Sequence, residues 1–131
     1  MAALLQFKTM TYYQGDDINF SIDIKQVAGN DITDWSFFPS VVVYLYTHQS
    51  YIAKFKNGTN AGYESLVLNS DATTYSGKLT PEQTRNMKGA LRMSMRVTDE
   101  AGDISTKEIE TGIRIAETPI KYEQHEQGRS I

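Results

Sequence analysis

The chain has 131 residues, a net charge of −3 and no cysteine, and 40% of its residues are hydrophobic. This length suits a single domain with its own core, and the composition is that of a globular protein. The small negative charge argues against a nucleic-acid partner, and the lack of cysteine excludes disulfides, thiolate catalysis and cysteine-based zinc sites.

No apolar run in the sequence approaches the ~18 residues that a membrane span needs. The first residues also lack the basic and apolar regions of a secretory signal. We therefore expect a soluble protein with no membrane partner.

The stretch from Asp17 to Ile24 alternates strictly between apolar and polar residues. Its apolar members are Ile18, Phe20, Ile22 and Ile24. A period of two predicts an inner strand with one buried face. The Gly15-Asp16 pair before it predicts a tight turn, and Leu4 to Tyr12 is expected to form a first strand at a sheet edge.

The segment Val41 to Thr47 is β-branched or aromatic at nearly every position, which predicts a central strand. One set of alternate residues should face the core, namely Val41, Val43 and Leu45. The other set, Val42, Tyr44 and Tyr46, then lies on the opposite face. A covering segment of the same chain and a partner protein both remain open as explanations for these tyrosines.

Four more strands are predicted, and they are Tyr51–Lys56, Tyr63–Asn69, Leu91–Val97 and Ile104–Ile115. In the second of these, Leu66 and Leu68 should point inward. Asn57-Gly58 is a hairpin-type turn signal, and the segment 99–103 predicts a hairpin loop. A change of parity along the last strand predicts a β-bulge near Thr106.

One short helix is predicted after Thr80, which is a suitable N-cap. Pro81 occupies the first helical position and Gln83 the third, and Gly89 is available to end the segment. Ile32 and Trp35 are expected to close one end of the core.

Seven alternating strands with short loops predict an all-β fold, an immunoglobulin-like antiparallel β-sandwich of about seven strands with one short connecting helix. The sandwich domain should span residues 1–116, and residues 117–131 should form a polar C-terminal tail. Ile120 and Tyr122 are apolar residues of that tail. Possible interface residues are Val42, Tyr44, Tyr46, Ile120 and Tyr122.

Catalytic and metal-binding patterns are weak. The two histidines, His48 and His125, lack a nucleophile-elbow glycine pattern nearby, and His125 alone has too few neighbouring ligands for a metal site. We expect no enzyme activity, no cofactor and no metal. Several acidic loop residues could supply oxygen ligands for calcium, but none of the loops has the spacing of a dedicated calcium site, and ordinary turn chemistry explains the same residues. These residues are Asp16, Asp17, Asp31, Asp34, Asp99, Glu100 and Asp103.

A locally basic region is also present. It contains Lys78, Arg85, Lys88, Arg92 and Arg96. Without interleaved aromatic residues, such a group is more often a solvated surface than a binding site. The tyrosine face of the 41–47 strand is the better candidate for binding.

The order of these features resembles the N-terminal domain of phage baseplate upper proteins and related tail or virion modules. The residues that carry the resemblance are Tyr13–Phe20, Asp31–Asp34, Val41–Leu45 and Met95–Asp103, within a match from Tyr12 to Ile115. The resemblance implies a structural module that joins components of a virion. It also implies that other virion or tail proteins are the partners, with self-association open, and it transfers no catalytic residues.

The leading hypothesis is therefore a non-enzymatic assembly module of a phage or prophage virion, located in the particle. The alternative is a carbohydrate-binding or adhesion module. Aromatic residues that such a module could use are Trp35, Tyr44, Tyr46 and Tyr51.

Overall fold

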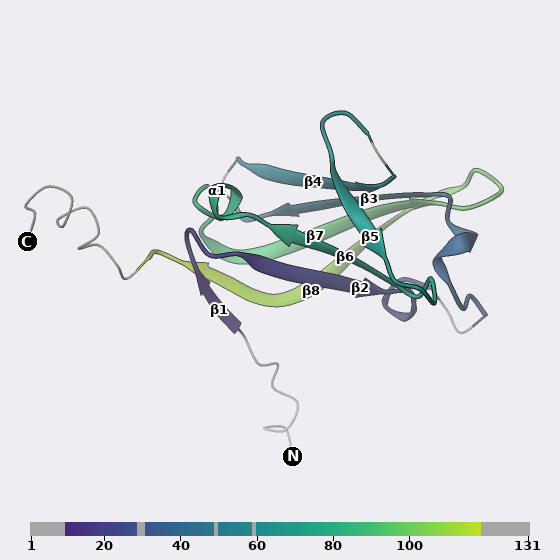
Figure 1. Cartoon of the computed structure of the whole chain (residues 1–131), viewed down its shortest axis with the longest axis horizontal. Coiled ribbons are helices and arrows are strands. Elements are labelled where there is room, and N and C mark those ends of the chain that lie inside the picture. The colour runs from purple at the N-terminus through teal and green to yellow at the C-terminus, as the bar shows by residue number, and fades with distance from the viewer. Residues whose placement is uncertain (1–9, 29–30, 49, 59, 119–131) are drawn as a thin grey trace, which may run out of the picture.

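The computed structural model of the chain describes residues 10–28, 31–48, 50–58 and 60–118. The strands are β1 (Met10–Tyr13), β2 (Ile18–Asp23), β3 (Ser40–Tyr46), β4 (Ile52–Asn57), β5 (Glu64–Leu68), β6 (Thr74–Leu79), β7 (Gly89–Thr98) and β8 (Ile104–Ala116). The helical elements are the 3-10 turns η2 (Ile24–Gln26) and η3 (Trp35–Phe37) and the short helix α1 (Pro81–Thr84). Figure 1 shows the strands wrapped around a common interior.

The eight strands form one mixed sheet that is nearly closed into a barrel, in the order β1-β8-β7-β3-β4-β5-β6-β2. The predicted two-sheet immunoglobulin-like sandwich is therefore wrong. Parallel pairing of β4 with β5, from Phe55 opposite Glu64 to Asn57 opposite Leu66, joins what would otherwise be two sheets. β1 also runs parallel to β8, with Met10 opposite Ile113, so the sheet is not purely antiparallel.

The core lies inside this curved sheet and draws one apolar face from nearly every strand. Buried strand residues are Ile18, Phe20, Ile22, Val41, Val43, Leu45, Ala53, Phe55, Leu66, Tyr75, Leu79, Leu91, Met93, Met95, Val97 and Ile115. The alternation predicted for β2, β3 and β7 is confirmed. Leu68 was predicted to point inward as well, but it is 39% exposed at the end of β5.

Each end of the core has its own cover. At one end Trp35 is 1% exposed, and its indole Nε1–H donates to the carbonyl of Thr73 at 3.0 Å. At the other end α1 begins at Thr80 with the predicted capping box, in which Thr80 and Gln83 bond each other's backbone. Met87, just after α1, is fully buried. The expected helix and the tryptophan plug are both confirmed.

Two local predictions are wrong, and one strand is missing from the predicted set. β2, expected to be an inner strand, is the last strand of the sheet and pairs only with β6 among the described strands. The strand β6 itself was not predicted. The turn at Asn57-Gly58 does not form a hairpin, because the strands on either side of it run parallel.

The β-bulge in β8 lies farther along the strand than predicted. The register moves from Arg92 opposite Glu110 to Ala90 opposite Arg114, so β8 carries extra residues there and Gly112 adopts a φ of +68°. Near Thr106 the pairing is regular, and Ile104 simply points outward with 64% of its surface exposed. The hairpin loop before β8 is confirmed, since the backbone N–H of Asp99 donates to the carbonyl of Asp103 at 3.0 Å.

The barrel wall is incomplete between its two outermost long strands. A hollow of about 210 Å³ lies there, lined by Phe20 and Ser21 of β2 and by Ile109 and Thr111 of β8. β1 lies beside β8 only from Ile113 onward. Of the predicted first strand, Met10 to Tyr12 is confirmed at the sheet edge, and Leu4 to Thr9 lies outside the described residues.

Candidate functional site

The candidate site is the outer face of β4, β3, β7 and β8, which we call the outer face. Pairing between these strands sets its side chains in rows, because directly opposed residues point to the same side of a sheet. The rows are Ile52–Tyr46–Arg92–Glu110, Lys54–Tyr44–Ser94–Glu108 and Lys56–Val42–Arg96–Thr106. A central column of two tyrosines and a valine therefore lies between columns that carry cations.

The tyrosines are held in place by hydrogen bonds within the face. The Tyr46 hydroxyl lies 2.9 Å from Ser94 Oγ. The Tyr44 hydroxyl bonds the Tyr63 hydroxyl, and burial, followed by the nearby Tyr63, raises the pKa of Tyr44 although Arg96 opposes that shift. Both rings are thus fixed and half-buried, which lowers the entropy they would lose on contact with another molecule.

Four cations surround this column, namely Lys54, Lys56, Arg92 and Arg96. Lys56 Nζ donates to Ser40 Oγ at 2.9 Å, and none of the four forms an ion pair with a carboxylate in the described part of the chain. Glu108 and Glu110 lie only along the β8 border of the face. The centre of the outer face is therefore cationic, although the whole chain is net acidic.

A groove adjoins the outer face where the bulge in β8 separates that strand from β7. Its volume is about 1010 Å³, and its lining includes the outward side chains of Tyr46, Arg92, Glu110 and Arg114. Thr111 Oγ1 donates to the carbonyl of Leu91 at 2.7 Å, so the two strands remain hydrogen-bonded across the bulge.

The predicted interface residues are only partly brought together. Val42, Tyr44 and Tyr46 share the outer face and are half-buried, with no second layer of described strands over them. Ile120 and Tyr122 lie outside the described residues, as does the predicted tail beyond Thr118.

The predicted basic region is not one surface. Lys78 of β6 pairs with Asp17 at 3.5 Å and Lys88 with Glu117 at 3.9 Å, and none of these four residues belongs to the strands of the outer face. Arg85 follows α1. Only Arg92 and Arg96 belong to the outer face. Their partners there are Lys54 and Lys56, which sequence analysis did not single out, although these lysines alternate with the buried Ala53 and Phe55.

The aromatic residues considered for sugar binding differ in exposure. Trp35 is buried in the core, so it cannot stack on a sugar. Tyr51 is partly buried and packs against the core cluster. Tyr44 and Tyr46 are the two that remain on a surface.

Acidic loop residues mainly bond their own backbone. Asp16 accepts from the N–H of Tyr13, and Asp99 accepts from the N–H groups of Ala101 and Asp103. Asp34 accepts from the hydroxyl and, to smaller effect, from the backbone N–H of Ser36, and these bonds lower the pKa of Asp34. Within the described residues, no three His, Asp or Glu side chains are grouped to hold a metal ion.

The two histidines are not part of a site in the described chain. His48 is exposed in the loop after β3, where its ring lies against Gly89. His125 lies outside the described residues. No helix in the described ranges is both long and apolar enough to cross a membrane.

No protein-family model matches this sequence, and no curated protein matches it. The resemblance to phage baseplate modules therefore stays a prediction.

Proposed function

We propose that this protein is a non-enzymatic module of a phage or prophage virion, of tail or baseplate type, that works through protein–protein contacts. The observation that carries the proposal is the outer face, where fixed tyrosines lie between cations that have no carboxylate partner in the described chain. Tyrosine and arginine are enriched in protein interfaces and at their energetic centres. The virion setting comes from the sequence resemblance alone.

The partner test uses the products of the neighbouring genes. Each is co-expressed with this chain, and complexes are separated by size exclusion with light scattering. Arg92→Glu together with Arg96→Glu should weaken a complex at least about tenfold. A partner that complements the cationic face presents negative charges, and the two new glutamates would repel them.

The matched control is Arg85→Glu with Lys88→Glu, which changes the net charge equally but lies at the α1 end of the barrel. It should leave the complex intact. If both double variants weaken the complex equally, the effect is one of general charge, and the outer face is not the binding surface. If the protein binds no virion protein at all, the assembly function is wrong.

Carbohydrate binding is the second candidate, and the groove beside Tyr46 favours it. An aromatic ring next to charged hydrogen-bonding groups, here Arg92, Glu110 and Arg114, is a usual arrangement for a sugar. A glycan array decides between the candidates. Saturable binding that is lost in Tyr44→Ala or Tyr46→Ala supports the second candidate, and no binding leaves assembly as the function to pursue.

A further inference from the structure

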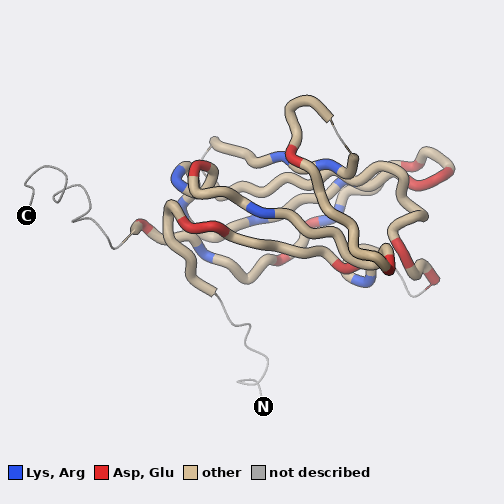
Figure 2. Tube along the Cα trace, in the orientation of Figure 1, with Lys and Arg blue, Asp and Glu red and all other residues tan. Residues whose placement is uncertain are grey.

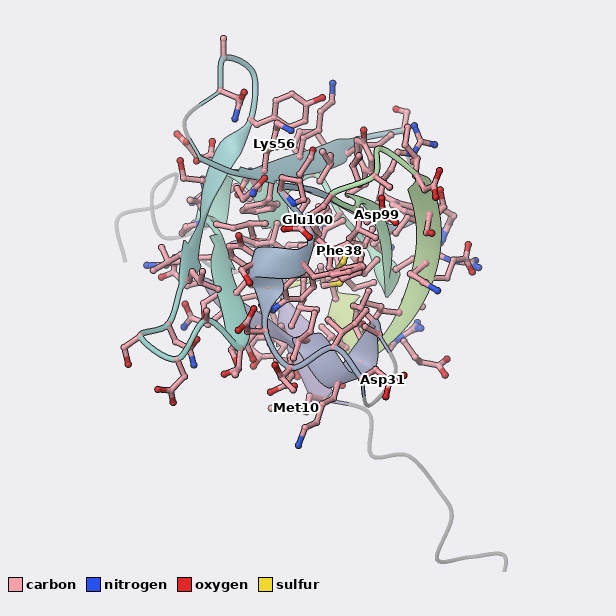
Figure 3. All side chains as sticks on the ribbon, turned by 90° about the vertical axis from the view of Figure 1, so that its right-hand side faces the viewer. Met10, Asp31, Phe38, Lys56, Asp99 and Glu100 are labelled. Atoms are coloured by element: carbon pink, nitrogen blue, oxygen red, sulfur yellow. The ribbon has the colours of Figure 1, made fainter. Side chains whose placement is uncertain are left out.

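One end of the barrel is acidic. It carries the loop before η3 and the loop between β7 and β8, and Figure 2 shows acidic residues on both loops at that end. Figure 3 looks onto this end and labels Asp31, Asp99 and Glu100. We call this surface the acidic end, and its carboxylates are Asp31, Asp34, Asp99, Glu100 and Asp103.

These carboxylates lack cationic partners in the described part of the chain. None of the five forms an ion pair with Lys or Arg among the residues that the structure describes. Asp34 and Asp99 are oriented by hydrogen bonds from the backbone of their own loops, so both loops present their carboxylates in set positions. Exposed apolar residues accompany them, since Phe37 is 38% exposed and Ile104 is 64% exposed.

The outer face has the opposite character. Its four cations are likewise without carboxylate partners in the described chain, and Ile52 at its border is 46% exposed. A cationic surface with apolar and aromatic residues at its centre therefore exists on the same molecule as an acidic surface with apolar neighbours. Such surfaces attract one another.

We propose that the outer face of one copy binds the acidic end of a second copy, an inference that rests on the proposed assembly function. The two surfaces are different parts of the molecule, so the contact is heterologous. Each contact leaves one outer face and one acidic end free, and copies can add until a ring closes or a neighbouring protein caps the row. Two outer faces would repel each other because both are cationic.

The contact should be weak in dilute solution and sensitive to salt, because exposed charges are screened. We expect sedimentation velocity to show concentration-dependent growth of the wild type at low ionic strength. Raising the salt to about 1 M, where the screening length falls to about 3 Å, should weaken the association at least about tenfold.

Complementation between two variants is the decisive experiment. The face variant carries Arg92→Glu and Arg96→Glu, and the end variant carries Glu100→Lys and Asp103→Lys. All four side chains are exposed, and circular dichroism checks that both variants fold. Each variant alone should remain monomeric, since it lacks one of the two surfaces.

A 1:1 mixture of the two variants should form heterodimers by a single route. The intact end of the face variant can bind the intact face of the end variant, whereas the two substituted surfaces have lost most of their net charge and cannot extend the complex. The control pair Arg85→Glu and Lys88→Glu should associate as the wild type does. A wild type that stays monomeric up to about 100 µM at low salt, where exposed pairs are least screened, would overturn the inference, as would a mixture that stays monomeric.

The end variant also separates this inference from the proposed function. Loss of self-association together with intact binding to a neighbouring gene product would leave the assembly function standing. If the wild type binds no virion protein but still self-associates, the assembly function fails while the contact between copies stands.

Discussion

Tyr44 shows three features of the outer face at one position, namely a half-buried ring, a hydrogen bond and a charge interaction with a cation. Its ring lies in the central column, its hydroxyl bonds Tyr63, and the positive charge of Arg96 lies close enough to act on its ionisation. Burial is the largest cause of its raised pKa, which means that the folded protein favours the neutral phenol.

The first prediction concerns Tyr44→Phe in alkaline solution. Since the folded pKa of Tyr44 is raised, its contribution to stability is complete below the unfolded value of about 10 and is lost as the pH rises through the folded value. The variant should lose about 0.5–1.5 kcal/mol near neutral pH, for the missing hydrogen bond, and should lose less further stability than the wild type above about pH 10.

Denaturant unfolding at neutral and alkaline pH measures both quantities, and absorbance at alkaline pH follows the phenol directly. The chain has eight tyrosines, so the difference between wild type and variant is the relevant signal. Parallel stability curves for the two proteins across the alkaline range would contradict the assignment of a raised pKa to Tyr44.

At the scale of elements, α1 shows how a very short helix can close a barrel. Thr84 at its end is fully buried, where its Oγ1 accepts from the N–H of Gly15 at 3.0 Å and donates to the carbonyl of Asp16 at 2.9 Å. One hydroxyl thus joins the helix to the turn between β1 and β2, which are the two terminal strands of the sheet.

The second prediction is that Thr84→Val lowers the free energy of unfolding by about 1–3 kcal/mol. Valine has nearly the same shape but leaves the N–H of Gly15 and the carbonyl of Asp16 without this partner. Thr106→Val is the matched control, because Thr106 is exposed on β8, and it should stay within about 0.5 kcal/mol of the wild type. Equal stability of the two variants would rule out the role assigned to Thr84.

At the scale of the whole molecule, a single sheet surrounds a single core. The parallel pairing of β4 and β5 makes the halves continuous, and buried residues from seven strands belong to one cluster. The same closure leaves the outer face and the acidic end as two distinct surfaces of opposite charge, which is what contacts between copies would need.

The third prediction is that the protein unfolds in one cooperative transition. Trp35, the single tryptophan of the chain, reports on one end of the core by fluorescence, and circular dichroism reports on the sheet as a whole. Because the core is one cluster, the two signals should give coincident transitions in urea. A tryptophan transition that clearly precedes the loss of sheet would indicate that η3 and its loop unfold separately.

Residue patterns alone determined the faces of the strands. The alternation along β2, β3 and β7 correctly separated buried from outward residues, and the Thr80–Gln83 capping pattern correctly began a short helix. These features are local, since a period of two and a cap depend only on neighbouring residues. They also sufficed to identify Val42, Tyr44 and Tyr46 as one outward group.

Some local features escaped detection because a partner strand defines them. β6 has only Tyr75 and Leu79 as buried members, and between them Gly77 leaves room for the ring of Phe20 from β2. A glycine in that position weakens the strand pattern, although here it marks close packing between two strands.

Only the tertiary structure decided which strands pair, in which direction, and which charges meet. Alternation is the same in a sandwich and in a barrel, so it could not reveal the parallel pairing of β4 with β5. For the same reason the sequence grouped Arg92 and Arg96 with Lys78 and Lys88, whereas pairing through β3 places them beside Lys54 and Lys56. Strand faces follow from neighbours along the chain, but a binding surface is assembled from residues far apart in sequence, and only folding brings those together.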